Sequence, residues 1–400
     1  MRGNFYVTPL LTSIILIISL VILFSGCNDL STGGEPYDPI KELVISKKFD
    51  QDRIIWAGDI IDLTVQAITA NGIPINIHQA DWSIDNDEIA SIGQNGQFHA
   101  KASGTVTVTA SHDSFTGSLQ LDILTYDLIF DSSSDGFNRL YSMSLNESEE
   151  PELLFDPGIQ VSQAVISPDE RYIAYISPGD NNNSDIYLYD LDTESNRRLT
   201  NEPETEDMPS WSPDSRYIAY RSFQDQGTGN IFKSELDSEQ TTNLTPDSIS
   251  AQSEKRAPSW SPDGSRIVYS SDAGGSMNLW LMNADGTSRQ QITYSDNYTT
   301  DPAWSPDREK IAFRRSYQGG SDILILNLTD MTETRFELPG YQRSPSWSPD
   351  GRWVAFSSQA SLEDQFEIYV IRPGGTDNRR VTLNPSWGGG MNPSFMVRKD

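Results

Sequence analysis

Short apolar runs alternate with turn-forming residues through the C-terminal two thirds of the chain, and the pattern repeats. Its marker is the sequence Trp-Ser-Pro-Asp, which begins at Trp211, Trp260, Trp304 and Trp347, with Ile166 in place of Trp in one further copy. Successive copies lie 45, 49, 44 and 43 residues apart. This spacing is typical of a repeat that forms one propeller blade rather than one helical hairpin.

Each copy continues with the same series of segments. After the marker comes an apolar triplet that ends in an aromatic residue, then a polar turn and a second apolar run. The triplets are Ile173-Ala174-Tyr175, Ile218-Ala219-Tyr220, Ile267-Val268-Tyr269, Ile311-Ala312-Phe313 and Val354-Ala355-Phe356. A final short run closes four copies on Thr200, Thr245, Thr293 and Thr382. Because the runs are short, rich in β-branched and aromatic residues and bounded by Gly, Pro, Asn and Asp, they predict strands.

Each repeat therefore predicts a four-stranded antiparallel sheet, in which the marker has the place of a turn. Proline fixes φ, and aspartate bonds to the backbone two residues on, so Ser-Pro-Asp suits a tight turn after a strand. We interpret the marker as blade architecture and not as an active site. The aromatic residues that end the triplets are expected to pack between blades.

The two ends of the repeat region predict how a ring of blades closes. Residues 127–155 hold three strand-like runs, but no marker strand precedes them. The missing strand is predicted at 393–397, where Pro393-Ser394-Phe395 imitates the Pro-Ser-Trp opening of a repeat. Pairing this strand with the first three removes an exposed sheet edge. Five complete copies and one shared blade predict a six-bladed propeller.

The best copy of the repeat also carries a resemblance. From Pro258 to Tyr269 the chain reads Pro-Ser-Trp-Ser-Pro-Asp-Gly-x-x-Ile-Val-Tyr, which resembles the repeat of TolB-like propellers, the WD-repeat-like blades of bacterial envelope proteins. The resemblance covers roughly residues 127–400 and implies an all-β, six-bladed propeller domain over residues 126–400. It does not imply an activity, because propellers carry unrelated functions.

The N-terminus resembles a bacterial lipoprotein signal. Arg2 precedes a 15-residue apolar stretch from Leu10 to Phe24, which is shorter than the roughly 20 residues that span a membrane. A Ser-Gly pair and the only cysteine, Cys27, follow, as in the lipobox, with Phe24 where Leu is usual. We expect residues 1–26 to be removed and Cys27 to carry lipid; an uncleaved signal anchor is the alternative.

A tether is predicted after the lipid site. Residues 27–39 are rich in Gly, Pro and Asp and poor in apolar residues, which favours a flexible segment. Residue 28 is Asn, and not the Asp associated with inner-membrane retention in lipoproteins with such signals. The resemblance therefore implies an outer-membrane lipoprotein, and leaves open whether it faces the periplasm or the cell surface.

Residues 40–125 differ from the repeats and predict a separate β-sandwich of immunoglobulin type. Runs such as 104–110 alternate apolar and polar residues, the period of half-buried strands. About seven such runs fit the sandwich, without a Cys pair. The segments that resemble group 2 bacterial immunoglobulin-like domains are 82–85, 89–92 and 100–105. The resemblance implies a spacer between membrane and propeller, or an adhesive module.

Charge narrows the range of partners. The chain has 57 Asp and Glu residues against 29 Lys and Arg, a formal net charge of −28. Such a surface repels phosphate backbones and anionic lipid head groups, which argues against nucleic-acid binding and against electrostatic membrane docking. Asp outnumbers Glu by 37 to 20 and Arg outnumbers Lys by 21 to 8, which fits either a salt-adapted source or an ordinary acidic secreted protein.

The positions of the histidines bear on catalysis. His78, His99 and His112 all precede the propeller, which has none. A Ser-His-Asp or Cys-His group and a His-ligated metal are therefore excluded there. Residues 131–136 imitate the opening of an EF-hand loop but lack the Glu at position 12, which favours a hairpin turn. We expect no catalytic residue, cofactor or metal ligand; a carboxylate pair of the glycosidase kind and a cation at a blade edge stay open.

Three functions remain to be weighed. The first is a lipid-anchored envelope protein whose propeller is a non-catalytic scaffold for a protein or peptide, held off the membrane by the immunoglobulin-like spacer. The second is a propeller-type enzyme that processes glycans or peptides, and the third is an adhesin that acts through the immunoglobulin-like domain. The lack of histidine in the propeller and of an appended catalytic domain favours the first.

A binding site is predicted at the mouth of the central channel. In propellers of this kind the strand that opens each repeat lies nearest the channel, so residues three and four places before the Trp position are expected to ring its mouth. The third place holds Gln163, Met208, Ala257, Asp301, Ser344 and Asn392, and the fourth Ser162, Asp207, Arg256, Thr300, Arg343 and Met391. Arginine is enriched where partners dock. The predicted contacts for acidic or amide groups of a partner are Gln163, Asp207, Arg256, Asp301, Arg343 and Asn392; solvated turns are the alternative.

Overall fold

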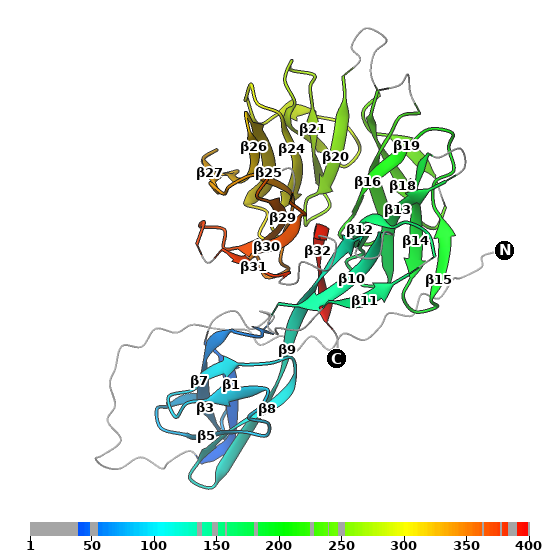
Figure 1. Ribbon diagram of the computed structural model, residues 1–400. Helices are drawn as coiled ribbons and strands as arrows, with labels where there is room; N and C mark the ends of the chain where they lie inside the picture. Colours follow the sequence, from blue (N-terminus) through cyan, green and yellow to red (C-terminus); the bar gives the residue numbers. More distant parts are fainter. Residues whose placement is uncertain are drawn as a thin grey trace, which may run out of the picture.

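The protein is all-β, with a sandwich domain ahead of a propeller, as predicted (Figure 1). The computed structural model describes residues 39–398, except 49–54, 134–137, 146–150, 157, 180–182, 225–227, 239, 247–252, 362–363, 377 and 383–389. Within these described ranges no helix is long and apolar enough to cross a membrane. The predicted signal, Cys27 and all but the last residue of the predicted tether lie outside them.

The N-terminal domain consists of two sheets around one apolar core. One sheet contains β1 (Ile40–Lys47), β3 (Ile60–Thr69), β4 (Pro74–Ile77), β6 (Ala90–Ile92) and β7 (Gln97–Ala100), and the other contains β2 (Ile55–Trp56), β5 (Asp81–Ile84), β8 (Gly104–His112) and the first part of β9 (Phe115–Ser132). Alternate residues of a strand point to one face, so Leu63 and Val65 of β3 meet Val106 and Val108 of β8 in the core. The alternating sequence of this segment has the structure that its period predicts.

Six blades of four strands form the propeller (Figure 1). The first blade contains the second part of β9, β10 (Arg139–Ser144), β11 (Glu152–Phe155) and the last strand, β32 (Gly390–Arg398). The next two are β12 (Ser162–Ile166), β13 (Tyr172–Pro178), β14 (Ser184–Asp190) and β15 (Ser195–Arg198), then β16 (Glu206–Trp211), β17 (Tyr217–Ser222), β18 (Asn230–Glu235) and β19 (Thr241–Asn243). Within each blade, neighbouring strands run antiparallel.

The remaining three blades follow in chain order. They are β20 (Lys255–Trp260), β21 (Arg266–Ser271), β22 (Asn278–Asn283) and β23 (Gln290–Gln291); β24 (Thr299–Trp304), β25 (Lys310–Tyr317), β26 (Gly320–Asn327) and β27 (Glu333–Arg335); and β28 (Tyr341–Trp347), β29 (Val354–Gln359), β30 (Glu367–Ile371) and β31 (Arg379–Arg380). The last two of these blades are joined by one parallel pairing, between Ser321 and Tyr341.

Repeated residues occupy repeated structural positions. The aromatic residues that end the triplets are at most 2 % exposed and pack between blades, as predicted: Tyr175, Tyr220, Tyr269, Phe313 and Phe356. The marker forms a turn, in which the Ser212 hydroxyl donates to Asp214 Oδ1 (2.6 Å) and accepts from the Tyr217 N–H (2.9 Å). The same turn recurs at Ser167, Ser261, Ser305 and Ser348. The marker is thus part of the blade architecture.

The ring closes by pairing the last strand with the first blade, as predicted. β32 runs antiparallel to β9, with Ser394 opposite Ile129 and Val397 opposite Tyr126. Phe395 takes the place that Trp holds in four of the repeats, and it is only 7 % exposed in the apolar cluster of this blade. The terminal strand thereby covers a β9 edge that would otherwise be open to solvent.

One strand, β9, belongs to both domains. Its first part pairs with β8 of the sandwich, and its second part pairs with β10 and β32 of the propeller. At the crossing point Trp56 packs edge-on against Tyr126, with ring centroids 5.4 Å apart. Arg352 of the propeller forms an ion pair with Asp59, which is buried in the sandwich. The boundary predicted after residue 125 therefore falls inside a continuous strand and not in a linker.

Candidate functional site

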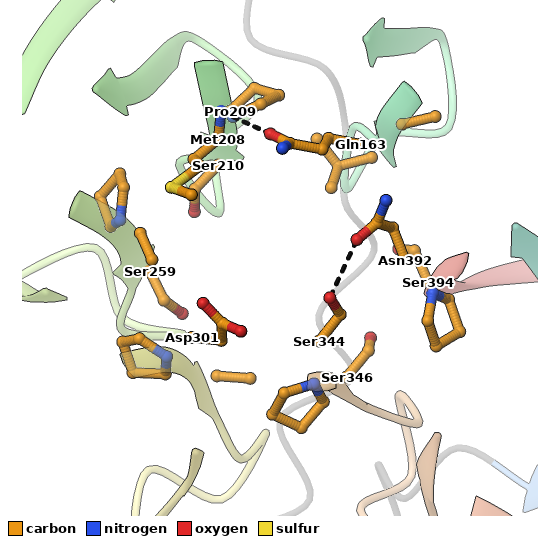
Figure 2. A pocket seen from close by; sticks show the side chains of 18 of the residues that line it. Gln163, Met208, Pro209, Ser210, Ser259, Asp301, Ser344, Ser346, Asn392 and Ser394 are labelled. Carbon is orange, nitrogen blue, oxygen red and sulfur yellow. Dashed lines mark hydrogen bonds between the residues drawn. The ribbon is translucent and has the colours of Figure 1, made fainter. Parts of the chain in front are cut away.

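The inner strands of the six blades surround a central channel (Figure 2). These strands are β12, β16, β20, β24, β28 and β32. The cavity has a volume of about 680 Å³, within the range of roughly 300–1,000 Å³ that ligand pockets occupy. Its wall is about equally polar and apolar, and its hydroxyl groups include those of Ser210, Ser259, Ser346 and Ser394. Such a wall offers hydrogen bonds from several directions at once.

A bulge shapes every inner strand at the same level. Each strand shifts register there, and one residue has left-handed backbone, with φ between 50° and 56°. Positive φ is uncommon outside glycine, and a bulge re-aims side chains. The six residues concerned are Gln163, Met208, Ala257, Asp301, Ser344 and Asn392. All six line the cavity, so the third-place residues lie where the sequence predicted.

Only some of the residues four places before the Trp position line the cavity. Ser162, Arg256, Arg343 and Met391 line the cavity, whereas Asp207 and Thr300 do not. Five of the six predicted contact residues therefore lie together on the channel wall: Gln163, Arg256, Asp301, Arg343 and Asn392. The prediction that places the sixth, Asp207, at the channel mouth is wrong.

Asp207 is held away from the channel by an ion-pair cluster. Its carboxylate accepts from Arg221 Nε at 2.7 Å, and Arg221 Nη1 donates to Glu254 of the next blade at 2.8 Å. The side chains of Asp207 and Arg221 are only 11 % and 12 % exposed. Because an unpaired buried charge is costly, the arginine directly opposite in the register takes this carboxylate. Arg221 thus links two blades, and Asp207 is its partner within its own blade.

Three arginines give the channel wall its charge. Arg256 Nη1 donates to the Tyr298 hydroxyl at 2.8 Å, and Arg314 Nε lies 3.3 Å from Asp301 Oδ2. The Arg343 guanidinium stacks 3.5 Å from the centroid of the Phe366 ring. Each of the three has an Nε with no hydrogen-bond partner among the described residues. With Asp301 as the only acidic side chain among the lining residues described, the wall carries three positive charges and one negative charge.

A buried carboxylate, Asp131, lies behind this wall. It faces Met391 across the β9–β32 pairing and is fully buried. Asn392 Nδ2 donates to its Oδ1 at 2.9 Å, and its Oδ2 has no partner among the described residues. Burial raises the pKa of Asp131 to about 7, against the opposing effects of Asn392, the Gln163 backbone and the charge of Arg343. The EF-hand comparison had placed Asp131 in a hairpin turn over residues 131–136. In the structure Asp131 lies within strand β9.

Sequence reasoning missed both Arg314 and Asp131. Each lies opposite a fourth-place residue, Arg314 facing Thr300 and Asp131 facing Met391. Both directly follow the aromatic residue that ends an apolar run, Phe313 in one blade and Phe130 in the other. Counting one place beyond each aromatic residue would have found them, because the residue opposite each fourth-place residue lies there.

Two family models match this chain. Residues 150–315 match the TolB beta propeller domain, and residues 56–122 match the bacterial Ig-like domain of group 2. The propeller is of the TolB type. The group 2 Ig-like domain precedes it, and both matches agree with the resemblances carried by the repeat and by residues 40–125.

Solved structures share the fold of the TolB-type propeller at low sequence identity. TolB from Acinetobacter baumannii is 18 % identical, with a TM-score of 0.60 over 82 % of this chain and 84 % of that one. A protein assigned as TolB from Agrobacterium tumefaciens is 18 % identical, with a TM-score of 0.51 over 69 % and 98 % of the chains. Hydrazine synthase of Kuenenia stuttgartiensis is 15 % identical, with a TM-score of 0.53 over 68 % and 47 %. These likenesses concern the fold alone.

The TolB-type propeller offers hydrogen bonding and charge at its channel. The chain's three histidines, His78, His99 and His112, all lie in the Ig-like domain. Among the described residues that line the channel there is no histidine or cysteine, so its serines have no imidazole base beside them. The arrangement suits recognition of a ligand that carries hydrogen-bonding groups and negative charge.

Proposed function

We propose that this protein is an envelope scaffold whose propeller channel binds a segment of a partner protein that carries acidic or amide groups. The observation that supports this most directly is the charge of the channel wall. The wall has three arginines and one aspartate, in a chain whose formal net charge is −28. A positive, concave site on an otherwise acidic molecule attracts the anionic part of a partner and repels it elsewhere.

The chemistry of the wall fits a polypeptide segment. A guanidinium presents a planar fork that pairs with carboxylate, and the three half-buried arginines of the wall border the cavity. The serine hydroxyls and the amides of Gln163 and Asn392 match peptide and amide groups, which both donate and accept. An extended segment therefore finds partners along the channel as well as at its arginines.

The test uses the mature protein as bait for detergent-solubilised envelopes. Arg256→Ala combined with Arg343→Ala removes two charges from the wall, and we expect it to weaken capture of the partner at least about tenfold, since hydrogen bonds to charged groups contribute about 1.5–3 kcal/mol each. The control is Arg216→Ala combined with Arg308→Ala. Those arginines are 61 % and 60 % exposed in ion pairs outside the channel, so the control changes net charge equally and is expected to capture normally.

Two results bear against the proposal. Equal capture by the channel variant and the wild-type protein would show that the channel is not the binding site, and would direct attention to the Ig-like domain as an adhesive module. Equal losses in the channel variant and the control would show that net charge matters and not this site. The melting temperature of both variants shows whether the fold is intact.

The anchor forms a further part of the proposal. The sequence up to Cys27 supports lipid attachment there, and Asn at position 28 supports retention at the outer membrane. Labelling cells with a fatty acid is expected to mark the wild-type protein and not Cys27→Ser. Label that persists in the serine variant would contradict lipidation at Cys27.

An enzyme remains the alternative to a scaffold. Hydrazine synthase shares the fold, but a shared propeller does not carry chemistry from one protein to another. The lining residues favour binding because they present arginine, serine and amide side chains without a histidine beside any serine. Hydrolysis of glycan or peptide substrates by the purified protein, lost in the channel variant, would overturn the scaffold proposal.

A further inference from the structure

A chain of hydrogen bonds runs around the channel and across the closure of the ring. The Ser344 hydroxyl donates to Asn392 Oδ1 at 2.9 Å, and Asn392 Nδ2 donates to Asp131 Oδ1 at 2.9 Å. The backbone of Gln163 also donates to Asp131. The Gln163 side chain in turn accepts from the Met208 N–H at 2.8 Å (Figure 2). Residues on the wall of four blades are thus linked, through side chains and backbone N–H groups, by way of one buried carboxylate.

The surroundings of Asp131 leave one of its oxygens free to take a proton. Asp131 is fully buried, and Oδ2 has no partner among the described residues. Its neighbours from β12 and β32 are the uncharged Gln163 and Asn392, and Leu140 of β10 lies opposite it in the register. From β28, Arg343 is the charged group whose field reaches it.

Arg343 belongs to the channel wall as well as to the surroundings of Asp131. No described carboxylate lies within ion-pair distance of Arg343, and two further charged groups act on it, Arg314 and Asp301. An anion that docks on Arg343 therefore adds negative charge near Asp131. The two negative charges repel each other in a poorly solvated region unless one of them is neutralised.

Resting on the proposed function, we propose that the channel binds a carboxylate group of its partner at Arg343 together with one proton at Asp131. The proton comes from solvent, joins the free Oδ2, and leaves again when the partner dissociates. Oδ1 remains the acceptor for Asn392, so the hydrogen-bond chain persists. The site then recognises an anion and a proton jointly.

The direction of the pH effect follows from linkage. The pKa of Asp131, raised by burial to about 7, allows it to exchange a proton near neutral pH. A carboxylate bound beside Arg343 raises this pKa further, so the complex holds more protons than the free protein. Binding is therefore expected to tighten as pH falls from 8 to 6, with a limit of tenfold per pH unit for one proton.

The experiment titrates the mature protein with two peptides by calorimetry. One is the acetylated and amidated hexapeptide Gly-Glu-Gly-Glu-Gly-Glu, and the other has Gln for Glu. Glutamate itself stays ionised between pH 6 and 8. We expect the Glu peptide to bind several-fold more tightly at pH 6 than at pH 8. Comparing two buffers of different ionisation enthalpy is expected to show proton uptake on binding, at most about half a proton at pH 7, where free Asp131 is already about half protonated, and more at pH 8. The Gln peptide is expected to bind without proton uptake.

Two variants test whether the proton binds at Asp131. Asp131→Asn imitates the protonated side chain, and we expect it to bind the Glu peptide equally at both pH values. Glu206 offers a matched control, because it is also fully buried, its Oε2 has no partner among the described residues, and burial raises its pKa to about 7. Glu206 lies outside the channel wall, so Glu206→Gln is expected to keep the pH dependence. If Asp131→Asn does not fold, the proton uptake measured for the wild-type protein still tests whether binding is coupled to a proton.

Several results would overturn this inference. They are affinity for the Glu peptide that is independent of pH or rises with pH, no proton uptake, pH dependence that survives in Asp131→Asn, and no binding of the Glu peptide at either pH. Binding that requires Arg343 but does not depend on pH would support the proposed function and contradict the coupled proton. Envelope partners captured equally by the Arg256→Ala, Arg343→Ala variant would instead remove the proposed function itself.

Discussion

Closure of the ring depends on one side chain of the last strand, Phe395. It takes the place of the repeated Trp, is 7 % exposed, and packs edge-on against Tyr126 with centroids 5.2 Å apart. Its cluster includes Leu128 and Phe130 from β9 of the first blade and Val370 from β30 of the last blade. Phe395→Ala therefore removes apolar contacts that join the terminal strand to both the first blade and the last.

The size of the effect follows from that burial. Replacing a buried Phe by Ala costs about 3–5 kcal/mol, because apolar surface is lost and a cavity remains. For a domain the size of the propeller, each kcal/mol lowers the melting temperature by about 2 °C, because the unfolding entropy is about 2.1 cal/mol/K per residue. Phe395→Ala is therefore expected to lower the melting temperature by on the order of 10 °C. Hydrogen exchange is expected to speed up first in β32 and in the second part of β9, which it pairs with.

Thermal unfolding followed by circular dichroism measures this shift, with Tyr294→Ala as the control. Tyr294 is 79 % exposed, and loss of an exposed side chain changes stability by about 0.5 kcal/mol or less. A melting temperature for Phe395→Ala within 2 °C of the wild-type value, or a loss no larger than that of Tyr294→Ala, would show that the terminal strand does not hold the ring together.

Three further predictions concern the whole molecule. Deleting residues 393–400 is expected to expose sheet edges of the first blade and to cause aggregation, so a truncated protein that elutes as a monomer with unchanged melting would contradict the closure. Burial raises the pKa of Glu206 to about 7, above an unfolded value of about 4.3, so this group's contribution to stability is lost as pH rises from about 4 to 7. Glu206→Gln is expected to melt above the wild type at pH 8 and level with it near pH 4, and an equal difference at both pH values would contradict this. With a formal net charge of −28, the protein is expected to melt higher in molar salt than in low salt, because salt screens self-repulsion, and a flat response would remove the salt-adapted interpretation.

Repetition explains why so much of the fold follows from sequence. A blade's strands pair with their neighbours in the chain, so short apolar runs and Ser-Pro-Asp turns specify each blade locally. The long-range pairing of β32 with β9 was also predictable, because the first blade lacks its inner strand and the C-terminus supplies a copy of it. Inner-strand position likewise placed Gln163, Asp301 and Asn392 on the channel wall.

What the sequence alone could not decide is which charged side chains face the channel. Asp207 and Arg256 hold the same place in their repeats, yet Arg221 draws the first into an ion pair while the second lines the cavity. The outcome depends on the residue across the strand pair and on the neighbouring blade, which lie far apart in sequence. Burial of Asp131 likewise arises only when the ring closes over it. The repeat determined the backbone because strand pairing is local, whereas the tertiary structure decided the charges, since a charged group is buried only where distant residues provide its partner.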